Sequence, residues 1–255
     1  MNPGAESSAR AGGKPPADAP ILELAGVSRH FGGLRVIENL NLNVAWGEVL
    51  GVLGPNGAGK STLFNLIAGV LPPSAGAVRF EGHDITRVKV WDRRRLGIGR
   101  TYQVPKPFAH MSVFENVLVA ATHGGGLSIA KGREEARSSL DLCGLGALSR
   151  KHAGELSLLN LKRLELAKAV VKQPPLLLLD EIAGGLTDGE CDELLTILSA
   201  IHKRGATIVW VEHVIHALKR LATRLAVLHF GAIICEGAPD AVLADDRVKE
   251  VYLGV

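Results

Sequence analysis

Apolar residues form short runs of two kinds along this chain, and both predict β-strands. In residues 40–44 they alternate with asparagine, the period of two that is typical of a strand with one buried face. Residues 176–179 and 207–211 are continuously apolar, which indicates strands buried on both faces of a sheet. Two further strands are expected, one from residue 21 toward a turn at Gly32 and Gly33, and one over residues 48–53.

Several longer segments carry apolar residues at the spacing of an amphipathic helix. These predicted helices cover residues 61–68, 113–121, 133–142, 161–171 and 190–203. The last of them joins the two continuously apolar strands, and such a crossover implies that those strands pair in parallel. The early alternating strand instead suggests an antiparallel sheet. We therefore expect an α/β fold with a mixed, mainly parallel core sheet, an antiparallel β subdomain and a helical lobe.

Composition along the chain suggests three parts. Residues 1–20 are rich in proline, glycine, alanine and serine and lack the apolar centre of an export signal, so they are predicted to be a flexible tail. Residues 21–237 form the predicted domain, with the helical lobe over about residues 106–171. Residues 238–255 form a C-terminal helix or tail. No run approaches the roughly 18 apolar residues that a membrane-spanning helix needs, so no span is expected.

The charge balance narrows the possible partners. The chain has 29 basic and 26 acidic residues, and the formal net charge of +3 is too small to predict a nucleic-acid partner. The densest basic run, Arg93 to Arg95, is interpreted as a solvated helix face without a function. The widely spaced Cys143, Cys191 and Cys235 match neither a disulfide framework nor a zinc site.

A glycine-rich segment between a predicted strand and a predicted helix matches the G-x-x-x-x-G-K-S/T pattern of phosphate-binding loops. Glycines let the backbone wrap closely around a phosphate, and amide groups with the helix N-terminus supply positive potential. In this pattern Lys60 reaches the β and γ phosphates, and the Ser61 hydroxyl can bind Mg²⁺. The loop consists of Gly54, Pro55, Asn56, Gly57, Ala58, Gly59, Lys60, Ser61 and Thr62.

Polar residues that follow predicted strands supply the remaining chemistry. Asp180 can hold Mg²⁺, and the neighbouring Glu181 can polarise the water that attacks a γ phosphate. A solvated strand end is the alternative, and the phosphate loop in the same chain weighs against it. His213 can donate a hydrogen bond to a γ phosphate, and Gln103 can contact Mg²⁺ or the attacking water, although either residue alone would more often be structural.

The order of these motifs resembles that of ABC-transporter ATPases, from residue 21 to about residue 237. The resemblance implies a P-loop ABC ATPase fold that binds ATP and Mg²⁺. It also implies that Gln103 is the glutamine-loop residue and Mg²⁺ ligand, that Glu181 is the catalytic base and that His213 is the switch histidine. Phe31 lies where an aromatic stacks on adenine, with a buried strand-end aromatic as the alternative. Ser157 lies in the Leu-Ser motif that caps the nucleotide of the opposite subunit.

More narrowly, the chain resembles the ATPases of branched-chain amino acid importers. The residues that carry this likeness are FGGL at 31–34, RTYQ at 100–103, MSVFENV at 111–117 and VKEVYLG at 248–254. Relatives that handle other amino acids, amides or urea share the last of these, so the solute stays open. The resemblance implies two transmembrane permease subunits, a second ATPase subunit and, indirectly, an extracytoplasmic solute-binding protein. It places the chain peripherally on the cytoplasmic face of the inner or plasma membrane.

One motif departs from the family pattern of Leu-Ser-Gly-Gly-Gln. This chain has Leu156, Ser157, Leu158, Leu159 and Asn160. Leu159 is expected to place a branched side chain where a glycine permits close backbone approach. Because this segment serves the nucleotide of the opposite subunit in the family, we hypothesise a heterodimer with two unequal ATP sites.

Two other functions are compatible with a phosphate loop. A soluble ABC ATPase of DNA repair or translation would usually carry long coiled-coil insertions or two cassettes, and neither fits this chain. A binding module that hydrolyses ATP weakly would suit the altered Leu-Ser motif. The presence of both Glu181 and His213 argues against such a module.

Overall fold

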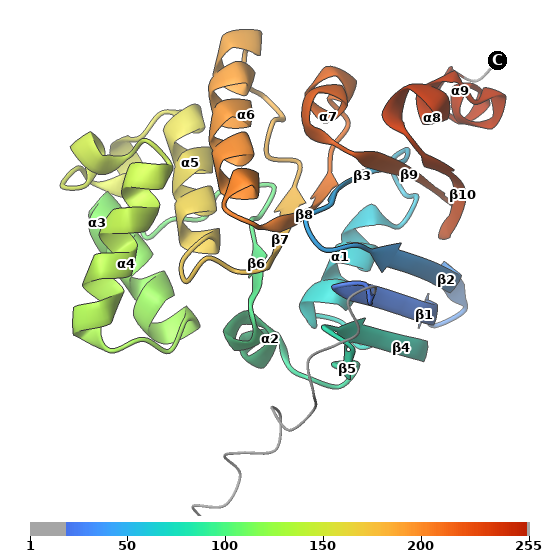
Figure 1. Cartoon of the computed structure of the whole chain (residues 1–255), viewed down its shortest axis with the longest axis horizontal. Coiled ribbons are helices and arrows are strands. Elements are labelled where there is room, and N and C mark those ends of the chain that lie inside the picture. The colour runs from blue at the N-terminus through green and yellow to red at the C-terminus, as the bar shows by residue number, and fades with distance from the viewer. Residues whose placement is uncertain (1–18, 254–255) are drawn as a thin grey trace, which may run out of the picture.

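The computed structural model describes residues 19–253, with side chains to residue 251, and its centre is a six-stranded sheet (Figure 1). The strand order is β10-β9-β3-β8-β7-β6, and all neighbours pair in parallel except the hairpin of β9 and β10. The strands are β3 (Val49–Leu53), β6 (Ile98–Arg100), β7 (Leu176–Asp180), β8 (Thr207–Val211), β9 (Arg224–His229) and β10 (Ala232–Gly237). The residues of β3, β7 and β8 are buried throughout, as continuously apolar strands require.

A second, antiparallel sheet has the order β2-β1-β4-β5. Its strands are β1 (Leu22–Phe31), β2 (Leu34–Val44), β4 (Ala75–Phe80) and β5 (His83–Asp84). The apolar residues of β2 at Leu40, Leu42 and Val44 are buried while the asparagines between them are exposed, which confirms the predicted alternation. Helix α1 (Lys60–Ala68) and the apolar faces of both sheets share one core that includes Leu50, Phe64 and Val78.

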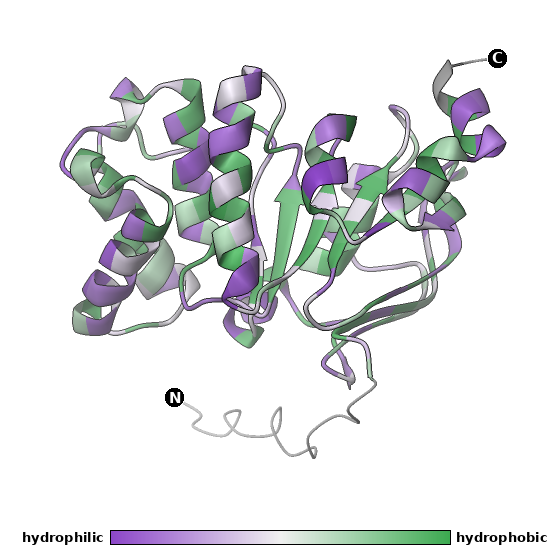
Figure 2. Ribbon diagram, turned by 45° about the horizontal axis from the view of Figure 1, so that its top comes forward, coloured by the Kyte–Doolittle hydropathy of each residue, from purple (hydrophilic) through white to green (hydrophobic). Residues whose placement is uncertain are grey.

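The buried residues of the lobe helices join one core with the central sheet, and the lobe lies at the opposite end of the molecule from the antiparallel sheet (Figure 1). Figure 2 shows that the strands of the central sheet are almost uniformly hydrophobic. None of the helices between residues 19 and 253 is both long and apolar enough to cross a membrane. Their bounds are α2 (Val90–Leu96), α3 (Val113–Val119) with a π-helical turn (Ala120–Gly124), α4 (Ile129–Leu142), α5 (Leu158–Ala169), α6 (Asp188–Lys203), α7 (Ile215–Leu221), α8 (Pro239–Ala244) and α9 (Asp246–Leu253), with 3₁₀ turns at Gly146–Leu148 and Ala153–Glu155.

The structure confirms the predicted fold class and most of the predicted elements. Helix α5 begins three residues earlier than expected because Ser157 caps it, accepting a hydrogen bond from the amide of Asn160. Strands β4, β5, β9 and β10 and helices α2 and α7 had no sequence prediction. Helices α8 and α9 lie in the segment predicted to be a C-terminal helix or tail. The predicted flexible tail lies outside the described residues, except for Ala19 and Pro20, and so does Gly254 of the closing motif.

The interpretation of Arg93 to Arg95 as a solvated face was wrong for two of the three residues. Arg93 is 1% exposed and donates hydrogen bonds to backbone carbonyls at the C-terminal end of α1 and in the segment before α2. Arg94 donates to the carbonyls of Lys168 (2.5 Å) and Ala169 (2.8 Å) at the end of α5. Only Arg95 is exposed. Carbonyls at helix C-termini attract cations, which explains why a basic run is buried here.

Candidate functional site

The glycine-rich loop connects β3 to α1 and depends on its glycines. Gly57 and Gly59 have φ values of +81° and +106°, which residues with a Cβ rarely adopt. At Gly54 a Cβ would lie 2.3 Å from the carbonyl oxygen of Leu228 in β9. The carbonyl of Ala58 accepts a hydrogen bond from the amide of Gly231 (3.0 Å), so the turn between β9 and β10 helps to hold the loop in place.

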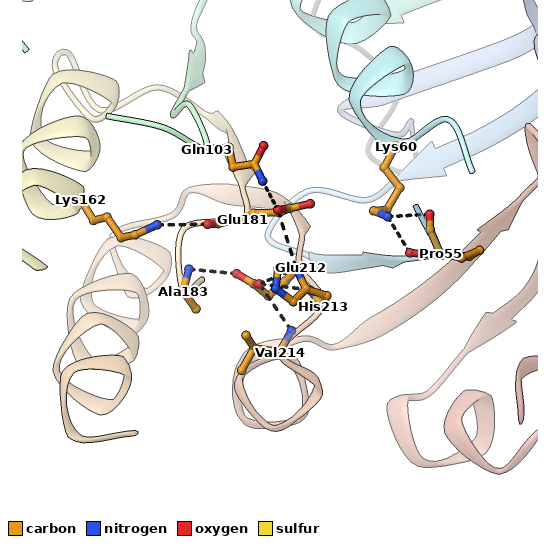
Figure 3. A network of polar contacts seen from close by, with 10 residues as sticks. Pro55, Lys60, Gln103, Lys162, Glu181, Ala183, Glu212, His213 and Val214 are labelled. Atoms are coloured by element: carbon orange, nitrogen blue, oxygen red, sulfur yellow. Dashed lines mark hydrogen bonds and ion pairs between the residues drawn. The ribbon is translucent and has the colours of Figure 1, made fainter. Parts of the chain in front are cut away.

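Lys60 is the first residue of α1 and is only 8% exposed. Its ammonium group donates to the carbonyls of Gly54 (2.5 Å) and Pro55 (2.9 Å), across the loop (Figure 3). Burial lowers the pKa of Lys60, while Glu181 and Asp180 act in the opposite direction. The negative charge of a phosphate group bound at this loop would therefore stabilise the protonated form of this partly desolvated ammonium.

Other predicted loop residues differ in how far they reach solvent. Ala58 is buried, whereas Asn56 and Ser61 are exposed and Pro55 and Thr62 are partly exposed. Because Ser61 lies in the first turn of α1, its hydroxyl shares the helix N-terminus with the amide groups that attract anions.

Asp180 ends strand β7, in the parallel sheet that also carries β3. It is 7% exposed and forms an ion pair with Arg100 at 3.2 Å, and its amide donates to the hydroxyl of Thr101 (3.1 Å). Burial raises the pKa of Asp180, opposed chiefly by Arg100. A divalent cation beside Asp180 would favour its ionised form, since a nearby positive charge stabilises a carboxylate.

Glu181 follows directly and has an unusual backbone conformation with φ +46°. Its amide donates to the carbonyl of Val211 in β8 (2.9 Å), and its carboxylate accepts a hydrogen bond from the side chain of Gln103. The ammonium of Lys162, on α5, donates to the backbone carbonyl of Glu181 at 3.2 Å. A left-handed conformation in a residue other than glycine costs about 1–3 kcal/mol and concentrates at functional sites.

His213 lies on the other side of Glu181, after β8 (Figure 3). Its Nδ1 is 3.7 Å from the Glu181 carboxylate and 3.7 Å from that of Glu212. Glu212 is completely buried, and its carboxylate accepts from the amides of Ala183 (2.9 Å), His213 (3.0 Å) and Val214 (3.4 Å). This buried carboxylate fixes the loops that carry Glu181 and His213.

Gln103, Glu181 and His213 thus come together, with the phosphate loop and Asp180 at the same carboxyl edge of the sheet. The side chains that hold them were not identified from the sequence: Arg100, Lys162 and Glu212. For Glu212 a weak sequence signal existed, because it directly precedes His213 at the end of an apolar strand. Lys162 carried no signal, since a lysine in an amphipathic helix is usually exposed.

The predicted Mg²⁺ ligands are Ser61, Asp180 and Gln103. They offer a hydroxyl, a carboxylate and an amide oxygen, and Mg²⁺ prefers oxygen ligands from one or two carboxylates together with substrate phosphates. Asp180 is the only carboxylate of the three; it is buried, and the charge of Lys60, the residue that would face the phosphates, acts on it. The chemistry of this donor set fits Mg²⁺.

Phe31 and Ser157 lie apart from this cluster. Phe31, at the end of β1, is 42% exposed and stacks against the guanidinium of Arg29 at 4.6 Å, so the alternative of a buried aromatic is wrong. Ser157 caps α5. The expectation for Leu159 needs correction, because its side chain is turned inward and is 7% exposed; Leu158, 42% exposed, presents the branched side chain at the surface.

Comparisons with known proteins agree on one family. The family model described as "ABC transporter" matches residues 37–184, and that described as "Branched-chain amino acid ATP-binding cassette transporter" matches residues 232–255. The chain is 31% identical over 250 residues to the high-affinity branched-chain amino acid transport ATP-binding protein BraF of Pseudomonas aeruginosa, covering 92% of this chain and 98% of the relative. A probable branched-chain amino acid transport ATP-binding protein of Archaeoglobus fulgidus is 35% identical over 246 residues, covering 92% and 95%.

The solved structures give the same result for the fold. The crystal structure of a nucleotide-free ATP-binding cassette from an ABC transporter matches with a TM-score of 0.84 at 30% identity, covering 92% of this chain and 99% of that one. The predicted two-sheet architecture with a helical lobe is therefore confirmed by structural likeness as well as by the strand pairing described above.

Proposed function

Because the chain belongs to the ABC transporter ATPases, we propose that it powers an importer for branched-chain or related amino acids. ATP hydrolysis is the activity of the family, and the relatives described above carry branched-chain amino acid transport in their names. One observation supports the catalytic assignment most strongly. The phosphate loop, Asp180, Glu181, Gln103 and His213 come from distant parts of the sequence and meet at one edge of the parallel sheet.

Each residue of the proposed site has a distinct task. The loop amides and Lys60 bind the β and γ phosphates of ATP, and Phe31 stacks on its adenine. Glu181 accepts a proton from the attacking water, and His213 donates a hydrogen bond to the γ phosphate. Ser61, Asp180 and Gln103 would hold Mg²⁺, which when bound offsets the charge of the phosphates.

A cleft in the helical lobe supports the proposed permease contact. It has a volume of about 700 Å³, and its lining includes Phe114, Glu115, Arg133, Arg137 and Arg150. It adjoins the segment from Gln103 to Phe114, which runs from the catalytic cluster into the lobe. We propose that a cytoplasmic segment of one of the two transmembrane permease subunits docks here, while the other permease subunit docks on the second ATPase. The chain would then work at the cytoplasmic face of the membrane and serve an extracytoplasmic solute-binding protein indirectly.

The altered Leu-Ser motif supports a second, different ATPase subunit. Leu158 is exposed in the first turn of α5, where a partner's nucleotide would approach Ser157. A branched side chain there keeps the γ phosphate further from the helix N-terminus than glycine would. We propose two unequal ATP sites in a heterodimer. Brisk, cooperative hydrolysis by the purified chain alone, as a homodimer, would contradict this assignment.

Affinity purification and reconstitution test the proposed function. The tagged chain, purified from detergent-solubilised membranes, should bring down two integral membrane proteins and a second ATPase. In vesicles, hydrolysis by this assembly should rise when the binding protein and leucine, isoleucine or valine are added. Recovery of the chain without membrane proteins would support a soluble ATPase. Tight ATP binding without turnover by the complete assembly would support a module that only binds ATP.

A further inference from the structure

Lys162 is a buried lysine on α5, the helix that begins at the Leu-Ser motif. It is 4% exposed, and its ammonium donates to the backbone carbonyl of Glu181 at 3.2 Å (Figure 3). None of the ion pairs within residues 19–251 includes Lys162. Burying an ammonium without a directly paired carboxylate is costly. A lysine held in this way points to a task that an apolar residue could not perform.

The electrostatic surroundings of Lys162 belong to the catalytic cluster. Burial lowers the pKa of Lys162, and the carboxylates of Glu212 and Glu181 oppose that effect. Glu212 in turn binds the amides of Ala183, His213 and Val214. The ammonium therefore lies in the field of the two carboxylates that flank His213.

The carbonyl that Lys162 binds belongs to a strained residue. Glu181 has φ +46°, a conformation that persists only where surrounding contacts hold it. Its amide is bound to Val211 in the sheet, while its carbonyl receives Lys162 and a longer bond from the amide of Gly184 (3.4 Å). The peptide group before Glu181 is therefore fixed to the core sheet, and the peptide group after it is fixed to α5.

Helix α5 links this contact to the opposite nucleotide. Ser157 caps the helix, and Lys162 follows five residues later, about 7.5 Å along the axis at 1.5 Å per residue. The far end of the helix is anchored by Arg94, which binds the carbonyls of Lys168 and Ala169. With that end anchored, a displacement of the first turn is carried to Lys162 and so to the backbone of Glu181.

We propose that Lys162 is a positioning residue that ties the backbone of Glu181 to α5, so that engagement of Ser157 by the partner's nucleotide sets the geometry of this chain's own catalytic base. This inference rests on the proposed ATPase function. Lys162 does not touch ATP or the attacking water; it acts through Glu181. It gives the chain a physical link between the two ATP sites of the assembly.

The test compares Lys162→Met and Lys162→Arg with the parent chain in the reconstituted assembly. Lys162→Met should lower kcat about tenfold, the loss expected for one charged hydrogen bond, with the Kd for ATP changed by less than about twofold. Lys162→Arg, which keeps the charge and a donor, should recover most of the rate. Lys172→Met is the control for loss of a lysine that donates to a backbone carbonyl, because the exposed Lys172 donates to that of Gly125 at 3.1 Å, outside the cluster.

Hydrogen exchange in the free chain provides a readout that does not depend on hydrolysis. Lys162→Met should accelerate exchange of the amides of residues 182–184, and Lys172→Met should not. If Lys162→Met does not fold, as judged by its circular dichroism and Tm, Lys162→Gln takes its place with the same expectations. An unchanged kcat with unchanged exchange overturns the inference, as does a loss of ATP affinity that matches the loss of rate. A parent assembly without ATPase activity would refute the proposed function. In that case the hydrogen-exchange comparison of Lys162→Met with the parent chain would decide whether Lys162 holds residues 181–184.

Discussion

Arg93 offers a sharp test of the packing, because its guanidinium is buried among backbone carbonyls. It donates to Leu66 and Ile67 (2.7 Å each), to Ile85 and Thr86 (2.5 and 3.1 Å), and to Val88 (2.9 Å). Burial lowers the pKa of Arg93 to about 10, so it stays protonated at neutral pH. These bonds close the C-terminal end of α1, the helix whose N-terminus carries Lys60.

Replacement of Arg93 by methionine should destabilise the fold strongly. The substitution keeps much of the apolar stem but removes every donor to those carbonyls. An unsatisfied buried polar group costs about 1–3 kcal/mol. Because the carbonyls of Leu66 and Ile85 also accept from the amides of Gly69 and Val88, the full sum does not apply, and we expect the free energy of unfolding to fall by about 3–5 kcal/mol.

Urea unfolding followed by circular dichroism and tryptophan fluorescence measures this loss. The denaturation midpoint should fall while the m-value stays the same. Arg95→Met, two residues further along α2 and exposed, should change the free energy of unfolding by less than about 0.5 kcal/mol. A loss below about 1 kcal/mol for Arg93→Met would refute the reasoning that this cation holds the end of α1.

Two further predictions address other parts of the chain. Burial raises the pKa of Cys143 to about 12, so its thiol should not react with a thiol reagent at pH 8 in the folded chain. The less buried Cys235 should react slowly. Rapid modification of Cys143 would mean that the lobe opens readily. Leu158→Gly should raise ATP turnover of the heterodimeric assembly several-fold by permitting closer approach to the partner's γ phosphate, and an unchanged or lower rate would show that the exposed leucine does not limit that site.

Sequence patterns predicted the parts of the fold that depend on local periodicity. Two strand predictions were confirmed, from the alternation in residues 40–44 and from the continuous apolar run in residues 207–211. Both succeed because the order of apolar residues directly reflects whether one or both faces of a strand are buried. Short elements such as α2 and β5 give too few residues for a period to be recognised. They form because tertiary contacts hold them.

Site residues that belong to a sequence motif could be predicted. Site residues whose role depends on their burial could not. The phosphate loop and the carboxylates after β7 follow from residue types at fixed spacing. Arg93, Lys162 and Glu212 are charged residues whose burial depends on carbonyls and amides supplied by distant segments. The direction of Leu159 depended on where α5 begins, because Ser157 as the cap turns Leu159 toward the core and Leu158 outward.

Glu181 is proposed to be the base for ATP hydrolysis in a transporter assembly. Turnover by the reconstituted assembly, measured for the parent and for Glu181→Gln, tests it most directly, since the substitution preserves the shape of the side chain and removes its basicity. We expect Mg²⁺-dependent ATP binding to change by less than about twofold while turnover falls by about 100-fold or more. Turnover that is unchanged by Glu181→Gln would contradict the claim.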